Sequence, residues 1–297
     1  MAGSAPPLGA AERVKELELQ GYTLLPGLLD PEQVGELREA VNTIELRHST
    51  YTDKQWYAHG VQWSGSPAVW RLIQHPATTA FLGELFGDEL VCVGVSYSRS
   101  DPGYPGMPLH TDSHPYGSSI LGASGTPPVL VRVLYYLNDL TPQRAPLRVV
   151  PFSHLSLHAD AMPYGRFRSD ADEEIVTCGA GDAVAINQRL FHAAGANRSD
   201  ASRALVAVSY RPAWARPVLP LPEPDSEQLE RLPEDIRPFL RQPNRGLRDT
   251  TIVNWRGDLP SGGRGLGPRR WSGHAQRSRE SGESGGTPNG RHPGDTR

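Results

Sequence analysis

His110-Thr111-Asp112 is the tripeptide with the clearest capacity for chemistry in this sequence. In a β-strand, residues i and i+2 point to the same face, so the imidazole and the carboxylate would project together into one cavity. His192 follows a predicted strand at residues 181–186, and Arg203 comes eleven residues later. Two histidines and one carboxylate with open coordination positions form the facial triad of non-heme Fe(II) oxygenases. An arginine guanidinium near such a triad can form paired hydrogen bonds with one carboxylate of a dicarboxylate co-substrate.

Each of these residues also has a common structural role. An H-x-D tripeptide often arises by chance, a histidine at a strand end is commonly satisfied by hydrogen bonds, and a single arginine commonly lies on the surface. Their order and spacing on an all-β background favour a metal site. Two alternatives stay open: a non-catalytic jelly-roll binding or scaffold protein, and a zinc hydrolase. The hydrolase would need a general base near the open position and would have no use for Arg203.

Short β runs separated by Gly and Pro follow Asp88. The predicted strands are residues 90–98, 129–137, 147–151, 174–177, 183–186 and 204–210. Seven or eight strands with frequent turns predict a mainly β fold with flanking helices and a double-stranded β-helix core, a cupin-like jelly roll. Along residues 129–138, Val131, Val133 and Tyr135 face one side, and Arg132, Leu134 and Tyr136 face the other. We expect one side to pack and the other to line a mixed cavity.

Helical spacing appears before and after these strands. Residues 10–20 predict a helix that ends before Gly21, residues 22–29 a short strand and turn, and Asp30-Pro31 an N-cap and first turn of a helix that runs to about Leu46. Residues 226–240 are helical but interrupted by Pro233 and Pro238. We therefore expect a flexible N-terminus over residues 1–9 and a single domain with a C-terminal wrap over residues 10–255. Residues 256–297, rich in Gly, Ser and Arg, should form a disordered tail.

Composition narrows the function classes. The 297 residues are 37% hydrophobic and 21% charged, and the apolar stretch at residues 90–95 is far shorter than the roughly 20 residues of a membrane span. No secretory signal is visible in the first twenty residues, so we expect a cytoplasmic protein. Cys92 and Cys178 are too few for a disulfide framework or a cysteine zinc site. The net charge is -3 although residues 256–297 hold eight Arg and four acids, so nucleic acid and membranes are not expected partners.

Four blocks in this order resemble the phytanoyl-CoA dioxygenase (PhyH) family of Fe(II)/2-oxoglutarate-dependent oxygenases, over about residues 10–215. They are residues 21–29, the His110-Thr111-Asp112 motif, residues 147–154 in place of the family's P-G-S-H strand end, and residues 181–203. Two departures predict altered loop geometry beside the pocket: Gln143-Arg144-Ala145 replaces Glu-Asn-Gly, and Phe152 replaces the Gly of P-G-S-H. The intact Asp112 favours oxygenation, because halogenating relatives carry a small residue there.

The resemblance implies a complete reaction. His110, Asp112 and His192 would bind Fe(II) as the catalytic and metal residues, 2-oxoglutarate would chelate the iron, and Arg203 would pair with the distal carboxylate. O2 would take the remaining position, with ascorbate as a reductant. The expected outcome is hydroxylation of a C–H bond in a small-molecule substrate, with release of succinate and CO2.

Further residues are candidates for the same cavity. Tyr97 and Arg132 are expected to bind the co-substrate; their alternative roles are a core aromatic and a structural ion pair. His114 and Tyr116 follow the metal motif and are candidates for substrate contact, whereas His154 is assigned a structural role. Trp56, Trp63 and Trp70 are placed to form a lid or to pack. The substrate stays open between an acyl-CoA, an amino acid and a specialised metabolite, although no basic patch for CoA phosphates is visible. The oligomeric state also stays open.

Overall fold

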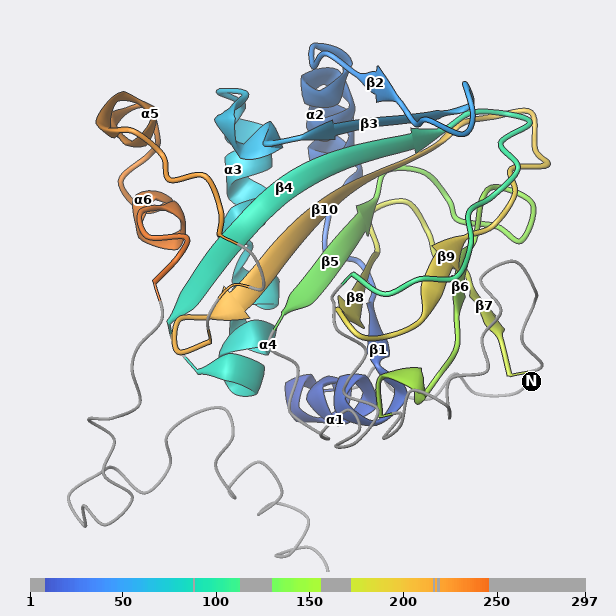
Figure 1. Ribbon diagram of the computed structural model, residues 1–297, viewed down its shortest axis with the longest axis horizontal. Helices are drawn as coiled ribbons and strands as arrows, with labels where there is room; N and C mark the ends of the chain where they lie inside the picture. Colours follow the sequence, from blue (N-terminus) through green and yellow to red (C-terminus); the bar gives the residue numbers. More distant parts are fainter. Residues whose placement is uncertain are drawn as a thin grey trace, which may run out of the picture.

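In the computed structural model, the described residues are 9–87, 89–112, 130–155, 172–215, 217 and 220–245. They form two antiparallel sheets with one apolar cluster between them, while helices cover the outer face of the larger sheet and enclose a second cluster there (Figure 1). This arrangement confirms the predicted jelly roll. Residues 1–8 and 246–297 lie outside the described part, so the flexible N-terminus, the domain limits and the disordered tail stay predictions.

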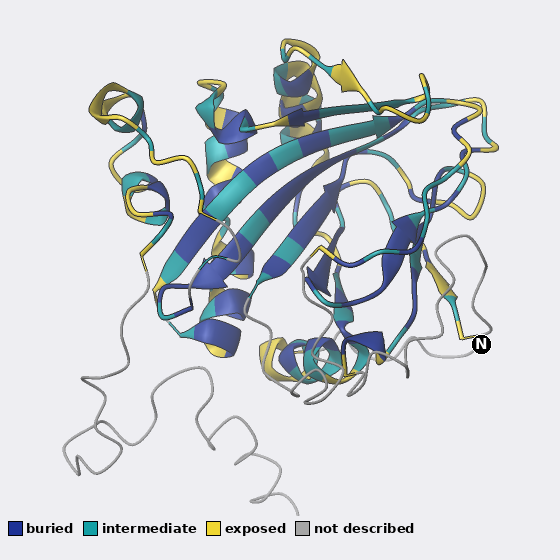
Figure 2. Cartoon of the chain, in the orientation of Figure 1, coloured by how far each residue is buried: buried dark blue, intermediate teal, exposed yellow. Residues whose placement is uncertain are grey.

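The larger sheet has seven strands and the smaller sheet has three. In spatial order, the larger sheet consists of β1 (Tyr22–Leu25), β8 (Ala183–Asn187), β5 (Val131–Tyr136), β10 (Arg203–Pro212), β4 (Leu90–Ser100), β3 (Gln55–His59) and β2 (Arg47–His48). The smaller sheet consists of β7 (Glu174–Val176), β6 (Leu147–Val149) and β9 (His192–Ala194). Figure 2 shows the central strands of the larger sheet buried along most of their length.

Helices form where capping residues and apolar spacing agree. Asp30 accepts a hydrogen bond from the Gln33 backbone at 2.8 Å and Pro31 is the first residue of α2, so the predicted start is confirmed. The helices are α1 (Ala10–Gln20), α2 (Pro31–Asn42), α3 (Pro67–Ile73), α4 (Pro76–Phe86), α5 (Ser226–Glu230) and α6 (Arg237–Leu240), with short 3-10 turns η1 (Val61–Trp63) and η2 (Ser153–Leu155). None of the described helices has the length and apolar character needed to cross a bilayer.

Several predicted boundaries were wrong. The second helix ends at Asn42 rather than Leu46, and the C-terminal helix splits into α5 and α6 around Pro233. The proline explains the split, because it lacks the N–H that would continue the helix. Strand β4 continues to Ser100, two residues beyond the predicted end. Helices α3 and α4 were not predicted at all.

The two faces of the larger sheet have different neighbours, as the alternation in β5 predicted. Val131, Val133 and Tyr135 pack in the core beneath the helices. Leu134 and Tyr136 pack against Leu147 and Val149 of the smaller sheet. The second face is therefore the inside of the jelly roll, and Arg132 shares it with Leu134 and Tyr136 because strand residues alternate.

Both departures from the family pattern adopt left-handed backbone conformations. Ala145 has φ 40° and Phe152 has φ 65°, and they are the only described non-glycine residues with positive φ. Glycine adopts this conformation readily, whereas a Cβ makes it costly. Both residues thus hold a backbone conformation that favours glycine, at the cost of strain. The altered loop geometry relative to the family stays a prediction.

Candidate active site

The three metal-ligand candidates meet where the chain after β4 runs antiparallel to β9. His110 and His192 form a bridge in which each backbone N–H donates to the other's carbonyl, at 3.0 and 2.9 Å. The Asp112 N–H donates to the Gln188 carbonyl at 2.8 Å. Gly106 permits this close approach, because its φ is 89° and a Cβ there would lie 3.1 Å from the Ala196 nitrogen. The sequence motif is thereby held against the strand that carries His192.

The donor atoms of the triad point to one centre. One ligand atom from each of His110, Asp112 and His192 lies within 4.8 Å of the others. The Nε2 atoms of His110 and His192 lie 3.9 and 3.7 Å from the Asp112 carboxylate oxygens. The Nδ1 atoms contact backbone carbonyls instead, of Pro108 at 3.1 Å and Leu190 at 2.9 Å. Because a carbonyl only accepts, each Nδ1 carries the proton and each Nε2 presents a lone pair to the centre.

The charges at the site suit metal ligation. Burial lowers the pKa of His110 to about 4, with help from the neighbouring His192, so the His110 imidazole is neutral near pH 7. Burial raises the pKa of Asp112, but Arg132, His192 and His110 together outweigh it and hold this pKa at about 2. Asp112 is therefore ionised. Neutral imidazole and ionised carboxylate are the protonation states in which these groups bind metal.

Arg132 lies on the inner face of β5 and contacts Asp112. Its Nη1 donates to both carboxylate oxygens, at 2.9 and 3.0 Å. The structure thus shows the ion-pair role for Arg132, with a triad residue as its partner, and the expected contact of Arg132 with the co-substrate stays a prediction. The ion pair also explains why a charged residue is tolerated on this otherwise apolar strand.

Arg203 begins β10 on the same inner face, beyond Tyr136. It pairs with Ser100 in the sheet register, whereas Arg132 pairs with Ser209 at the other end of β10. Arg203 is 4% exposed, and its Nε is buried and has no hydrogen-bond partner among the described residues. Burial lowers its pKa, and electrostatic interactions with Tyr136, Tyr104, Tyr51 and Tyr97 oppose this effect. A buried cation with a free donor is suited to an anionic ligand.

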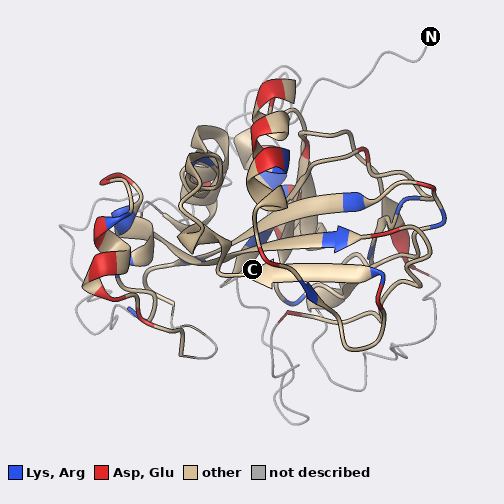
Figure 3. Cartoon of the chain, turned by 90° about the horizontal axis from the view of Figure 1, so that it is seen from above, with Lys and Arg blue, Asp and Glu red and all other residues tan. Residues whose placement is uncertain are grey.

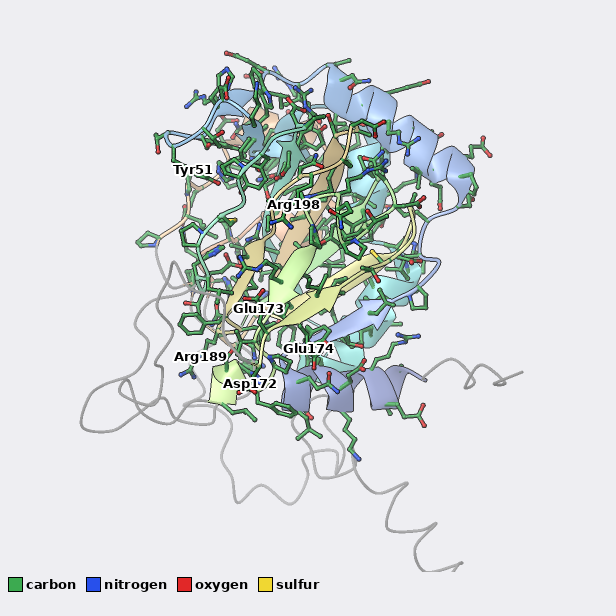
Figure 4. The ribbon with its side chains drawn as sticks, turned by 90° about the vertical axis from the view of Figure 1, so that its right-hand side faces the viewer. Tyr51, Asp172, Glu173, Glu174, Arg189 and Arg198 are labelled. Atoms are coloured by element: carbon green, nitrogen blue, oxygen red, sulfur yellow. The ribbon has the colours of Figure 1, made fainter. Side chains whose placement is uncertain are left out.

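A pair of tyrosines near Arg203 was not anticipated from the sequence. The hydroxyls of Tyr51 and Tyr104 lie 2.8 Å apart. Asn197 connects Tyr104 to Arg203's partner strand, because its N–H donates to the Tyr104 carbonyl and its Nδ2 donates to the Ser100 carbonyl, both at 2.9 Å. Tyr51 is half-exposed in the loop between β2 and β3, at the far end of this side of the molecule from Glu173 and Glu174 (Figure 4). No spacing in the sequence links these tyrosines to Arg203.

Tyr97 occupies the opposite face of the sheet from the triad. It pairs with Val206 of β10 and Ala58 of β3, and it packs in the core beneath the helices. Tyr97 thus has the core-aromatic role that was its alternative, and its expected contact with the co-substrate stays a prediction. Strand alternation places Ser96 and Ser98, rather than Tyr97, on the inner face with Arg203.

A cavity of about 700 Å³ reaches Asp112 of the triad and its partner Arg132. Strand β4 contributes Gly94 and Ser96, and β10 contributes Ser209. Trp63 of η1 also lines this cavity, and the lid role expected of this region stays a prediction. Trp70 donates to the Gln62 carbonyl at 2.9 Å and Trp56 donates to Asp101 at 2.7 Å, so both act in packing.

The remaining candidates divide between a structural role and the undescribed part. His154 is buried, and its Nε2 contacts the Glu18 carbonyl at 2.9 Å. This contact ties η2 to α1 and agrees with the structural role expected of His154. His114 and Tyr116 lie outside the described residues, so their expected contact with substrate stays a prediction.

The donor set fits Fe(II). Two imidazoles and one carboxylate on one side of the centre form the 2-His-1-carboxylate set typical of non-heme iron, and a site with this set retains open coordination positions. Both imidazoles are oriented by backbone carbonyls and the carboxylate by Arg132. Such outer contacts accompany metal ligands because they fix the ligand atoms in place.

A family model described as phytanoyl-CoA dioxygenase (PhyH) matches residues 17–205, more than half of the chain. The match includes His110, Asp112, His192 and Arg203. The chain belongs to the PhyH family. The resemblance of the four sequence blocks is thereby confirmed.

Curated relatives of this PhyH chain are dioxygenases by name. Dioxygenase andF of Emericella variicolor is 28% identical over 188 residues, covering 62% of both proteins. Dioxygenase af480 of Aspergillus fumigatus is 27% identical over 179 residues, covering 59% of this chain and 54% of that protein. The PhyH chain thus spans less than two thirds of the length of these relatives.

Solved structures share the fold of the PhyH chain. The non-heme α-ketoglutarate-dependent epimerase SnoN from nogalamycin biosynthesis superposes with a TM-score of 0.57 and 24% identity, over 70% of this chain and 84% of SnoN. HygX from Streptomyces hygroscopicus, crystallised with nickel and 2-oxoglutarate, gives a TM-score of 0.54 and 18% identity, over 68% of this chain and 86% of HygX. At these identities the likeness establishes the jelly-roll fold.

Proposed function

We propose that this PhyH chain is an Fe(II)- and 2-oxoglutarate-dependent dioxygenase that hydroxylates a C–H bond of a small organic molecule. The observation that carries the proposal is the triad geometry: three ligand atoms within 4.8 Å, with both Nδ1 atoms bonded to backbone carbonyls. The PhyH match and the relatives named dioxygenases support it. Arg203 favours this function over a zinc hydrolase, which has no use for a buried cation awaiting a carboxylate.

The chain's own residues would position the reactants. His110, Asp112 and His192 would hold the iron, and Arg203 would receive the distal carboxylate of 2-oxoglutarate. Bound iron and 2-oxoglutarate supply O2 activation, in which one oxygen atom enters succinate as CO2 leaves and the other enters the substrate. Arg132 keeps the Asp112 carboxylate oriented and ionised. The smaller sheet and the buried inner face of β5 exclude water from the side of the site opposite the cavity.

The cavity favours a compact substrate without phosphates. Its 700 Å³ volume lies within the usual range for sites that bind drug-sized molecules. Among the described lining residues, Arg132 is the one Lys or Arg, and it is paired with Asp112, while Glu223 adds a negative charge. Lys and Arg are scattered among Asp and Glu in Figure 3 rather than gathered on one face. Of the three substrate classes, an acyl-CoA is therefore the least suited.

Metal-dependent binding of 2-oxoglutarate tests the proposed cofactors. Protein loaded with Mn(II), which fills the iron site without turnover, should bind 2-oxoglutarate in calorimetric titration, and His192→Ala should bind neither. His48→Ala removes an exposed histidine instead and should bind both normally. Binding of 2-oxoglutarate that persists in His192→Ala would contradict the metal assignment. Absence of binding in the unaltered protein would favour the non-catalytic scaffold.

A further inference from the structure

A C-terminal segment, residues 220–245 and hereafter the wall segment, lines the cavity that reaches Asp112. It contributes five apolar side chains, one acid and one amide: Leu221, Pro222, Pro224, Leu240, Pro243, Glu223 and Gln228. Figure 1 shows α5 and α6 of this segment beside the ends of β4 and β10 that lie away from the smaller sheet. Neither the sheet nor the triad residues alone would enclose the cavity on this side.

The wall segment is attached to the sheet by one buried arginine. Arg211 of β10 is 1% exposed, and all its hydrogen bonds among the described residues go to backbone carbonyls. Its Nη1 donates to Pro212 at 3.1 Å and to Ala215, and its Nη2 donates to Pro243 and Arg245, both at 2.6 Å. Burying a guanidinium costs free energy. Because all the hydrogen bonds of Arg211 among the described residues go to uncharged carbonyls, the directions of its N–H groups matter more here than its positive charge.

A second set of hydrogen bonds connects this attachment to the start of the wall segment. Asn244 lies in the chain between Pro243 and Arg245, whose carbonyls accept from the Arg211 Nη2. Its Oδ1 accepts from the Leu221 N–H at 2.8 Å, and its Nδ2 donates to the Leu221 carbonyl at 2.9 Å. Arg211 thus fixes residues 243–245, and these residues fix Leu221 at the cavity. Between the two ends of the wall segment, Leu232, Ile236 and Leu240 pack in the core beneath the helices.

The attachment point lies beside an irregularity in the sheet. The register between β10 and β4 shifts between Ser209 and Tyr210, so that Ser209 faces Gly94 and Tyr210 faces Cys92. Bulges of this kind redirect side chains and are common next to active sites. Ser209, Gly94 and Cys92 all line the cavity, and Arg211 follows two residues after Ser209. Arg211 therefore lies next to the residues of β10 and β4 that line the cavity.

We infer that the wall segment selects the organic substrate and that Arg211 is the positioning residue that fixes it. This inference rests on the proposed function for the reaction itself. The selected molecule has an uncharged, mainly apolar body that packs against the prolines and leucines of the wall segment, with the C–H bond to be oxidised toward Asp112. Arg211 has no contact with the triad among the hydrogen bonds of the described residues, so it acts on substrate binding alone.

Binding of a neutral tetracycle tests this inference. Equilibrium dialysis of progesterone against protein loaded with Mn(II) and 2-oxoglutarate should show saturable binding, whereas palmitoyl-CoA at equal concentration should not bind. Arg211→Met should weaken progesterone binding at least tenfold, and Arg211→Lys, which retains donors for the carbonyls, should recover part of it. The affinity for 2-oxoglutarate should move less than twofold. Arg231→Met is the matched control, since it removes an exposed guanidinium from the same segment.

Hydrogen exchange shows whether Arg211 acts through the wall segment. Arg211→Met should speed amide exchange over residues 221–245 and leave β8 and β9 unchanged. Should this variant not fold, Leu221→Trp provides the second test: it narrows the cavity without touching Arg211 and should weaken progesterone binding at least tenfold. Unchanged progesterone binding in both variants, or no progesterone binding in the unaltered protein, would overturn the inference. If the unaltered protein loaded with Mn(II) bound progesterone but not 2-oxoglutarate, that result would instead contradict the proposed reaction.

Discussion

The Arg132 guanidinium on β5 binds both carboxylate oxygens of Asp112, at 2.9 and 3.0 Å, although the two residues are 20 positions apart. The pair joins the inner face of the larger sheet to the segment that carries the metal motif. Together with His192 and His110, Arg132 also keeps the Asp112 pKa at about 2 against the opposing effect of burial. Arg132 thus orients the carboxylate of a proposed metal ligand.

Replacing Arg132 with Met should weaken metal binding. The carboxylate of Asp112 would lose the contact that fixes its orientation, and loss of such an outer contact lowers metal affinity by roughly 10- to 100-fold. Titration with Mn(II), followed by the electron paramagnetic resonance signal of free metal, measures the change. Arg71→Met, which breaks an exposed pair with Glu36, is the control. Unchanged or tighter binding in Arg132→Met would mean that the guanidinium competes with the metal instead of orienting its ligand.

Arg203→Ala should raise the KM for 2-oxoglutarate more than it lowers kcat. Hydrogen bonds to charged groups contribute about 1.5–3 kcal/mol, so we expect an increase in KM of about tenfold to a hundredfold. Initial rates of succinate formation over a range of 2-oxoglutarate concentrations provide both constants. An unchanged KM would assign the distal carboxylate to another residue.

The sequence predicted the layers and the triad because both depend on local patterns. Alternation in residues 131–136 identified the inner and outer faces, and the H-x-D spacing identified two ligands. It did not place Tyr97 on the outer face of its strand, because the face of a strand residue depends on its register, which lies outside the motif. It also failed for Tyr51, Tyr104 and Arg211, whose roles depend on contacts between segments far apart in the chain.

Phe152 provides a test of backbone strain at a family glycine position. Phe152→Ala and Phe152→Gly both remove the same phenyl ring, which is 57% exposed, but only glycine relieves the φ of 65°. We expect the Gly variant to be more stable than the Ala variant by about 1 kcal/mol. Urea unfolding of the two variants measures the difference. Equal stability, or a more stable Ala variant, would show that this turn is not strained.

Acidification should destabilise the fold through His154. Its Nε2 donates to a carbonyl and its Nδ1 has no partner among the described residues, and burial, with Arg189, lowers its pKa to about 4 from 6.5. The unfolded chain therefore binds this proton first, and the free energy of unfolding decreases as pH falls from 6.5 to 4, by at most about 1.4 kcal/mol per pH unit. His154→Gln should show a shallower decrease in urea unfolding between pH 7 and 5. A slope equal to that of the unaltered protein would contradict this origin.

Succinate formation tests the central claim most directly. Purified protein with Fe(II), ascorbate, O2 and 2-oxoglutarate should form succinate, and a pool of uncharged polycyclic compounds should increase the rate. His192→Ala should abolish the reaction while circular dichroism shows an intact fold, because the variant lacks one of the three ligands. Succinate formation that survives in His192→Ala, or its absence from the unaltered protein with every substrate pool, would contradict the assignment of this PhyH chain as an iron- and 2-oxoglutarate-dependent dioxygenase.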